Sequence, residues 1–263
     1  MIQKKGSVLM KTFTKDLLTV HVAQTAAEMG AAAAADIYAA ICEKLSQKEE
    51  INMIFAAAPS QNTTLAALLE KDIEWERINA FHMDEYIGLQ EGSNASFQTY
   101  LRDHLFSKAP FKSINYIHAF SDDKEAECAR YSALLEQYPV DIVVLGIGEN
   151  GHIAFNDPPV ADFADTALIK PVKLDERCRV QQVHDGCFAT IDDVPQYALT
   201  LTIPALLRAD RMFCVVPYAT KAEAVKEMLT TEHIDEHCPA TALRRHAGAT
   251  LYCDNESAKG LVR

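Results

Sequence analysis

The chain has 263 residues, of which 49% are hydrophobic and 24% are charged, values that are usual for a globular protein with one large core. Its net charge of −12 argues against nucleic acid or an anionic membrane as the main partner. The seven cysteines include no C-x-x-C pair, and no apolar run has the length of a signal peptide or a membrane span. We therefore expect a single domain over residues 1–263 in the cytoplasm, with reduced thiols.

Short apolar segments alternate along the chain with segments of helical pattern. The predicted helices cover residues 19–48, 65–69, 123–137 and 219–230. The predicted strands cover residues 51–58, 77–83, 114–120, 141–146, 198–203, 211–217 and 249–254. Strands that alternate with helices in this way form a parallel sheet with helices on both faces, so the sequence predicts an α/β fold.

The stretch from Asp141 to Pro158 is the most informative part of the sequence. Its first half is a short apolar run, rich in Val and Ile, that ends in glycine, as a central strand buried on both faces does. Its three glycines then allow sharp turns and a close approach to a ligand. His152 and Asp157 follow just past the strand, where open α/β sheets bind their ligands. A lone histidine is usually a satisfied polar residue, but one between glycines and near a carboxylate is better interpreted as catalytic.

A second acidic cluster, Asp84-Glu85-Tyr86, follows the predicted strand 77–83. Two adjacent carboxylates could by themselves form only a solvated turn. Here two acidic clusters stand at the ends of two strands, and strand ends on one edge of a sheet share a crevice. A carboxylate base together with a His–carboxylate pair can move protons on a sugar or a hydroxyacid. We therefore interpret Asp84, His152 and Asp157 as one catalytic group.

An anion site is predicted where the loop 59–64 opens a helix. The loop offers hydroxyls, amides and helix-start N–H groups, which suit a phosphate, although an ordinary helix cap would use the same residues. Lys221 lies in the first turn of the predicted helix 219–230, where the helix dipole disfavours a cation. A bound phosphate would explain this position, and a solvated lysine would explain it almost as well.

Three other polar segments carry weaker signals. The segment 233–238 fits no zinc signature and is expected to be a polar helix end or loop. Arg244, Arg245 and His246 are expected to form a basic cluster on the surface. Arg179 stays undecided between a structural and an anion-binding role.

Two motifs resemble the signatures of a known family. Phe81-His82-Met83-Asp84-Glu85-Tyr86-Ile87-Gly88-Leu89 and Leu145-Gly146-Ile147-Gly148-Glu149-Asn150-Gly151-His152-Ile153-Ala154-Phe155-Asn156 are similar to those of glucosamine-6-phosphate deaminase (isomerase), and weaker agreement covers nearly the whole chain past Thr12. The resemblance implies a Rossmann-like three-layer sandwich with a mostly parallel central sheet. It also implies conversion of glucosamine 6-phosphate to fructose 6-phosphate and ammonia, with no metal and no organic cofactor.

The resemblance assigns roles to individual residues. Asp84 matches the carboxylate that carries the proton between C2 and C1, and His152 matches the imidazole that assists ring opening. Asp157 stands where the family usually has the Glu that orients this imidazole, and Asn150 is a tolerated variant of Asp. The predicted substrate-binding residues are Ser60, Gln61, Asn62, Thr63, Glu85, Gly151, Arg179 and Lys221.

The chain departs from the family pattern at three places. Ala57-Ala58-Pro59-Ser60-Gln61 replaces a Thr-Gly-Gly-[Ser/Thr]-Pro type phosphate loop, and the loss of both glycines limits how closely N–H groups can surround an anion. The phosphate-binding arginine of the family is replaced near His184. Asp157 in place of Glu shortens the reach by about 1 Å, which matters where geometry must hold to ~0.5 Å.

Two other functions stay open. One is hydrolysis by a sister family, the 6-phosphogluconolactonases, which shares the Gly-x-Gly-x-x-Gly-His core but lacks the Asp84-Glu85-Tyr86 signature. The other is a non-catalytic sugar-phosphate sensor, which the altered phosphate loop would suit. The expected partner is a phosphorylated amino sugar, with no nucleic acid and no membrane, and a homo-oligomer is left open.

Overall fold

The structure is a computed structural model that describes residues 10–261. The segment Met1–Gly6, part of the region searched for a signal peptide, lies outside the described residues. Within the described range, no helix combines the length and the apolar character needed to cross a membrane.

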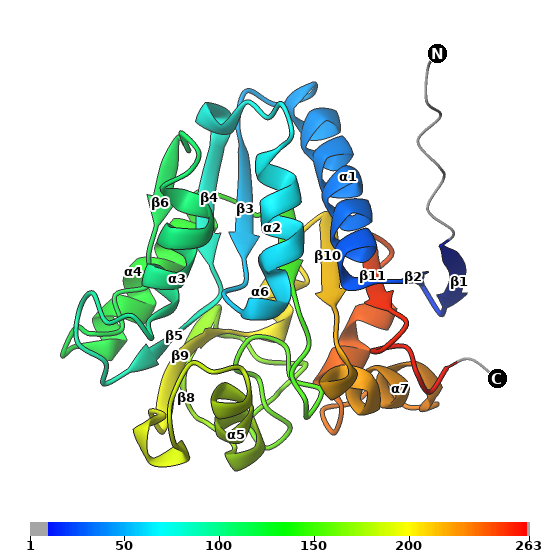
Figure 1. The fold of residues 1–263 in the computed structure, drawn as a ribbon. Coiled ribbons are helices and arrows are strands. Elements are labelled where there is room, and N and C mark those ends of the chain that lie inside the picture. Colours follow the sequence, from blue (N-terminus) through cyan, green and yellow to red (C-terminus); the bar gives the residue numbers. More distant parts are fainter. Residues whose placement is uncertain (1–9, 262–263) are drawn as a thin grey trace.

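The described residues form one large sheet at the centre of the molecule (Figure 1). Neighbouring strands pair in parallel, except that β1 forms an antiparallel hairpin with β2. The predicted mostly parallel sheet is therefore confirmed. In spatial order its strands are β1 (Lys11–Lys15), β2 (Leu18–Ala23), β11 (Ala249–Asp254), β10 (Arg211–Val216), β7 (Ile142–Leu145), β3 (Ile51–Phe55), β4 (Ile78–His82) and β6 (Ser113–Asn115).

Strand β7 is covered on both faces of the sheet, because all four of its side chains are 0% exposed. Ile142 and Val144 pack into the hydrophobic cluster on one face of the sheet, and Val143 and Leu145 pack into the cluster on the other face. The first cluster is covered by α1 (Ala26–Leu45), α2 (Asn62–Leu69), α3 (Phe97–Leu101) and the π-helical turn η3 (Arg102–Phe106). The second is covered by α4 (Lys124–Gln137), α6 (Ile203–Leu206) and α7 (Ala222–Thr230). The predicted three-layer sandwich is confirmed.

A small antiparallel sheet lies beside the carboxyl ends of the central strands (Figure 1). Its order is β5 (Asp84–Ile87), β9 (Tyr197–Leu201) and β8 (Ile169–Lys173), and α5 (Glu176–His184) lies beside it. Of these elements, β9 was predicted from the sequence, whereas β5, β8 and α5 were not. The Asp84-Glu85-Tyr86 signature is thus a strand in its own right, paired through its backbone with β9.

The predicted helix 19–48 is wrong over its first part, where the chain forms β2. Leu18, Val20 and Val22 alternate with more exposed residues, and this period of two with β-branched side chains favours a strand. The helix begins only after Thr25, whose hydroxyl accepts a hydrogen bond from the N–H of Glu28 at 3.2 Å.

The predicted surface cluster around Arg244 is also wrong, because the side chain of Arg244 is buried. Its Nε donates to Asp16 Oδ2 at 2.6 Å, and its Nη1 donates to the carbonyls of Met228 and Thr231 near the end of α7. A guanidinium has five N–H donors, so it can satisfy these last helical carbonyls and a carboxylate together.

The direction of the chain changes between β3 and β7, which are neighbours in the sheet. From β3 the chain continues outward to β4, whereas from β7 it continues to β10 on the other side. The segments that follow β3 and β7 therefore diverge and leave a crevice at the carboxyl end of the sheet, where α/β proteins bind ligands.

The contact between α1 and α2 generates the first prediction. A Cβ added to Gly30 in α1 would lie 2.6 Å from Thr63 Oγ1 in α2 and 2.9 Å from the Thr63 carbonyl carbon. We expect Gly30→Ala to lower the free energy of unfolding by about 1–3 kcal/mol through overpacking, although alanine favours helix by about 1 kcal/mol. Urea denaturation measures the change.

The matched control is Ala35→Gly, at an exposed position in the same helix. It should cost about 1 kcal/mol through helix propensity alone. An increase in stability for Gly30→Ala would contradict the close helix contact.

Candidate active site

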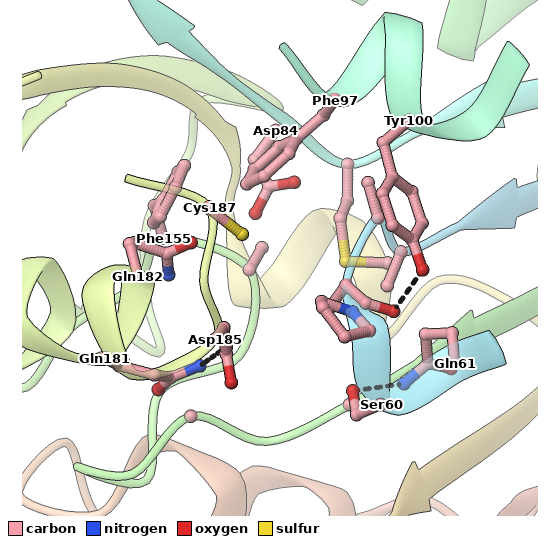
Figure 2. Close-up of a pocket in the computed structure, with 18 of the residues that line it drawn as sticks. Ser60, Gln61, Asp84, Phe97, Tyr100, Phe155, Gln181, Gln182, Asp185 and Cys187 are labelled. Carbon is pink, nitrogen blue, oxygen red and sulfur yellow. Dashed lines mark hydrogen bonds between the residues drawn. The ribbon is translucent and has the colours of Figure 1, made fainter. Parts of the chain in front are cut away.

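The crevice at the carboxyl end of the sheet holds a cavity of about 710 Å³ (Figure 2). Its wall combines residues that follow three neighbouring central strands, as expected for the point where the chain direction changes. The lining residues come from segments 56–61 after β3, 83–84 after β4, 93–100, 146–155 after β7, 181–187 in and after α5, and from Lys221 before α7.

His152, Asn150 and Asp157 form one hydrogen-bonded group. His152 Nδ1 lies 2.7 Å from Asn150 Oδ1 and 3.0 Å from Asp157 Oδ1. Two acceptors at Nδ1 favour the tautomer with the proton on this nitrogen, which leaves Nε2 free to accept a proton. Asn150 Nδ2 also donates to Asp157 Oδ1 at 2.9 Å, so the amide connects the imidazole to the carboxylate.

The imidazole fits here because residue 148 is glycine. A Cβ on Gly148 would lie 2.1 Å from His152 Cε1, closer than any side chain could be placed. The N–H of Gly148 in turn donates to the carbonyl of His152 at 2.9 Å. The absence of a side chain at Gly148 therefore lets the imidazole pack directly against the backbone, a role that was not predicted from the sequence.

Asp157 is fully buried, and its two oxygens accept three N–H donors. Oδ2 accepts a hydrogen bond from the N–H of Asp175 at 3.0 Å, and Oδ1 accepts hydrogen bonds from His152 Nδ1 and Asn150 Nδ2. Burial raises the pKa of Asp157, but the hydrogen bonds and the charge from His152 outweigh it and hold the pKa below its usual range. Asp157 is therefore an anion that orients the imidazole.

Asp84 lies in the same cavity as His152, in the position predicted from the two strand ends. Its carboxylate points into the cavity near the ring of Phe97 (Figure 2). Thr200 connects Asp84 to the loop that carries His152. Its backbone pairs with Asp84, and its Oγ1 accepts the N–H of Phe155 at 3.0 Å. One residue of β9 thus fixes both the Asp84 strand and the loop that carries His152.

The environment of Asp84 is the reverse of that of Asp157. Burial, followed by the nearby charge of Glu85, raises the pKa of Asp84 well above its usual value. His82 supports the backbone here, with Nδ1 2.9 Å from the carbonyl oxygen of Asp84. Burial lowers the pKa of His82 to about 4, so its ring is neutral at pH 7. Asp84 is therefore a carboxyl group that can both hold and release a proton.

Glu85 does not line the cavity that contains Asp84. Its carboxylate accepts the N–H groups of Tyr86, Phe97 and Gln98, so it holds the start of α3. Burial raises the pKa of Glu85 to about 7, although these N–H donors act in the opposite direction. Glu85, which was predicted to bind substrate, therefore lies outside the cavity.

Ser60, Gln61 and Lys221 also line the cavity. Gln61 Nε2 donates to Ser60 Oγ at 3.1 Å and to the Val215 carbonyl at 3.2 Å. The ammonium of Lys221 makes no hydrogen bond or ion pair within residues 10–261, although only 3% of the residue is exposed. Burial lowers the pKa of Lys221. A buried lysine without a protein partner is an anion-binding candidate.

The loop that carries Lys221 has a strained backbone. Tyr218 has φ 78° and ψ 147°, a conformation that non-glycine residues rarely adopt. The N–H of Tyr218 is held by Asp254 Oδ2 at 3.2 Å. This strain lies three residues before Lys221, and the turn directs the lysine into the cavity.

Four other predicted binding residues lie outside the cavity. Asn62 accepts a hydrogen bond from the Tyr100 hydroxyl, and Thr63 faces Gly30 in the contact between α1 and α2. Arg179 donates to the carbonyls of Ile191 and Val194 and lines a separate depression. Gly151 has φ 82° and shapes the loop before His152 without lining the cavity.

Much of the cavity wall was not predicted from the sequence. These residues come from α3 and from α5 and the turn after it: Phe97, Tyr100, Gln181, Gln182, Asp185 and Cys187. The Gln-Gln pair followed by Asp-Gly was a polar turn signal that could have marked this segment. The family resemblance had placed a phosphate-binding position near His184 in this segment, whereas periodicity and spacing alone did not relate the segment to β7.

One group of side chains has the composition of a metal site. Ligand atoms of His152, Asp157 and Cys178 lie within 4.8 Å of one another. Burial and the charge of Asp157 raise the pKa of the Cys178 thiol well above its usual value, which favours a thiol that donates to Asp157. A metal would also have to displace the N–H donors of Asp157.

Comparison with known proteins assigns the family. The family model described as "Glucosamine-6-phosphate isomerases/6-phosphogluconolactonase" matches residues 24–252. The chain belongs to this family. It is 34% identical over 242 residues to a protein named glucosamine-6-phosphate deaminase from Bacillus cereus (strain G9842), covering 92% of this chain and 87% of that protein.

Two solved structures agree with the family assignment. One, titled as a monomeric glucosamine-6-phosphate deaminase, matches with a TM-score of 0.82 and 31% identity, covering 91% of this chain and 98% of that chain. A 6-phosphogluconolactonase from Shewanella baltica matches with a TM-score of 0.72 and 16% identity, covering 94% and 99%. At that identity the second match supports the shared fold alone.

The aspartate that replaces the usual glutamate of the glucosamine-6-phosphate isomerase family still reaches the imidazole. The distance from His152 Nδ1 to Asp157 Oδ1 is 3.0 Å, a normal hydrogen bond. Asn150 shares the same imidazole nitrogen, so the shorter carboxylate is accompanied by a second acceptor. The substitution therefore keeps the orientation of His152.

The donors around Asp157 generate the second prediction. Asp157→Asn would turn an acceptor into a group whose NH₂ faces other N–H groups, so we expect the free energy of unfolding at pH 7 to fall by about 1–3 kcal/mol. The folded pKa of Asp157 lies below the usual value near 3.9, so the stability from the carboxylate is complete above about pH 4 and is lost as pH falls through the folded pKa.

The difference between wild type and Asp157→Asn should therefore shrink in denaturation experiments below about pH 4. Asp122→Asn, at an exposed carboxylate, is the matched control and should show little effect. A difference that stays constant at low pH would contradict the assigned ionisation.

Proposed function

We propose that this protein converts an amino sugar 6-phosphate, foremost glucosamine 6-phosphate, into the ketose phosphate and ammonia. One observation carries the proposal. A carboxyl with a raised pKa, Asp84, and an oriented imidazole, His152, face one cavity from two strand ends. The names of the relatives point to the same reaction. The seven free cysteines support a reducing, cytoplasmic location.

His152 would assist the opening of the sugar ring. Its Nδ1 proton is held by Asn150 and Asp157, so Nε2 can take the proton of the anomeric hydroxyl and return it to the ring oxygen. The anionic Asp157 stabilises the imidazolium formed in between. Asn150 and Asp157 thus orient the imidazole of His152, and Asp157 stabilises its charged form.

Asp84 would carry out the isomerisation of the open-chain sugar. As a carboxylate it takes the proton from C2 and gives it to C1 on the same face. The amine nitrogen loses one proton and O1 gains one, so the C1 aldehyde becomes an alcohol and an imine forms at C2. The resulting imine takes up one water and loses ammonia, leaving the ketose. A raised pKa suits this step, because the same group must accept and then release a proton near neutral pH.

The phosphate would bind at the far end, at Ser60, Gln61 and Lys221. Binding energy from this remote group can hold C1 and C2 at Asp84. No metal or organic cofactor is needed for any of these proton transfers.

The third prediction tests the proton carrier. Asp84→Asn keeps the shape of the side chain but removes the base, so kcat for glucosamine 6-phosphate should fall by about 10²–10⁴-fold while KM changes little. Ammonia release measures the rate. The wild-type reaction in D₂O should place deuterium at C1 in at least part of the product, since a proton held on Asp84 can exchange with solvent before it reaches C1.

The unfolding temperature of the Asp84→Asn variant is the control for this prediction. An amide avoids the cost of ionising a buried carboxyl, so the variant should unfold at the same temperature as wild type or higher at pH 7. Rapid turnover by Asp84→Asn, or hydrolysis of a phosphogluconolactone in preference to any amino sugar phosphate, would overturn the proposed function.

The fourth prediction concerns Lys221. Lys221→Met keeps the apolar stem but removes the charge, so KM for the phosphorylated substrate should rise by about 10–100-fold with a smaller change in kcat. Lys226→Met, on an exposed position of α7, should leave KM unchanged. If KM is also unchanged in Lys221→Met, another group binds the phosphate.

A further inference from the structure

The anion end of the cavity has an unusual balance of charge. Lys221 is the one lysine or arginine among the described residues that line the cavity, whereas Asp84 and Asp185 both line it. Burial lowers the pKa of Lys221, and the charges of Asp185 and Glu149 act in the opposite direction. A phosphate dianion bound at Lys221 would therefore lie near a carboxylate that repels it.

The side chain of Asp185 is held in place by the protein. Gln181 Nε2 donates to Asp185 Oδ2 at 3.2 Å, and Gln181 Oε1 accepts the N–H of Glu149 at 2.8 Å. In Figure 2 Asp185 lies across the cavity from Ser60. The carboxylate is thus attached to the loop after β7 through Gln181, and it faces the space where the anion would bind.

We propose that Asp185 makes this site select a singly protonated phosphate, with one proton shared between the phosphate and the Asp185 carboxylate. This inference rests on the proposed function, since it takes the anion to be the 6-phosphate of the substrate. Lys221 and Ser60 would bind the remaining phosphate oxygens. The shared proton turns a repulsive contact into a hydrogen bond between an acid and an anion.

The surroundings of Asp185 contain several other titratable groups. Three of them line the same cavity as Asp185, and its charge acts on each: Lys221 in the turn before α7, Tyr100 in α3, and Cys187 in the loop of Asp185 itself. Glu149, with His184 Nδ1 at 3.3 Å, lies on the loop after β7, and His152 and Asp84 lie farther along the cavity. The other groups are unchanged when Asp185 alone is replaced, so a variant at this position separates its contribution from theirs.

The test measures binding by calorimetry with glucose 6-phosphate, which lacks the amine that is lost in the reaction. A phosphate monoester loses its second proton near pH 6, so at pH 7 about nine-tenths of the ligand is dianion. Wild type should therefore take up about 0.9 proton per ligand at pH 7, measured in two buffers of different ionisation enthalpy. Its Kd should rise by about tenfold per pH unit above ~6.5.

Asp185→Asn should lose both effects, because an amide can donate to the dianion. Its Kd should change little between pH 6 and pH 8, with no proton uptake, and at pH 8 it should bind about tenfold or more tightly than wild type. Asp192→Asn, an exposed carboxylate outside the cavity, should behave as wild type.

The outcomes separate this inference from the proposed function. Proton uptake that persists in Asp185→Asn, or a wild-type Kd that is the same at pH 6 and pH 8, would overturn the role of Asp185 even if ammonia is released. Absence of binding to wild type and variant at both pH values would also overturn it. Binding with the expected proton uptake, but without ammonia release from any amino sugar phosphate, would uphold the inference and refute the deamination.

Discussion

Strand β7 is packed between two hydrophobic layers, with two side chains in each, and none of its four side chains is exposed. A shift of one residue would exchange the side chains between two differently shaped layers, so the register is strongly fixed. The end of β7 is fixed with it, and this end leads directly into Gly148 and His152. The neighbouring β3 places Ser60 and Gln61 in the same way, so the geometry of the site follows from the packing of the sheet.

Two aspartates in one site have opposite electrostatic environments, although both are buried. Asp157 accepts N–H groups from Asn150 and Asp175 and faces His152, and its pKa is lowered. No hydrogen bond to the carboxylate of Asp84 is found among the described residues, and its pKa is raised. Since both are buried, the difference comes from the donors around Asp157 and from the charge of Glu85 near Asp84. One carboxyl stays charged and orients a ring, while the other is suited to exchanging a proton.

The sequence predicted those parts of the site that depend on strand ends. Asp84, His152 and Asp157 follow short apolar strands, and parallel strands bring their carboxyl ends together. The phosphate loop was predicted only in part, because the turn Pro59–Gln61 is a 3₁₀ helix that directs Ser60 and Gln61 to the cavity, while Asn62 and Thr63 turn toward other helices. Asp185 was not predicted to line the cavity, although the resemblance had placed a phosphate-binding position near the adjacent His184, because no local pattern relates α5 to a distant strand.

Helix α5 contacts both ends of the site. The N–H of Asp175, its N-terminal cap, binds Asp157, and Asp185 follows its last turn at the anion end. Nine helical residues at about 1.5 Å each span about 13 Å, so the length of one helix sets the separation of the two ends. A residue inserted into α5 would rotate everything after it by about 100°. A relative that acts on a shorter or longer sugar phosphate would therefore need a different α5, and not only different side chains in the cavity.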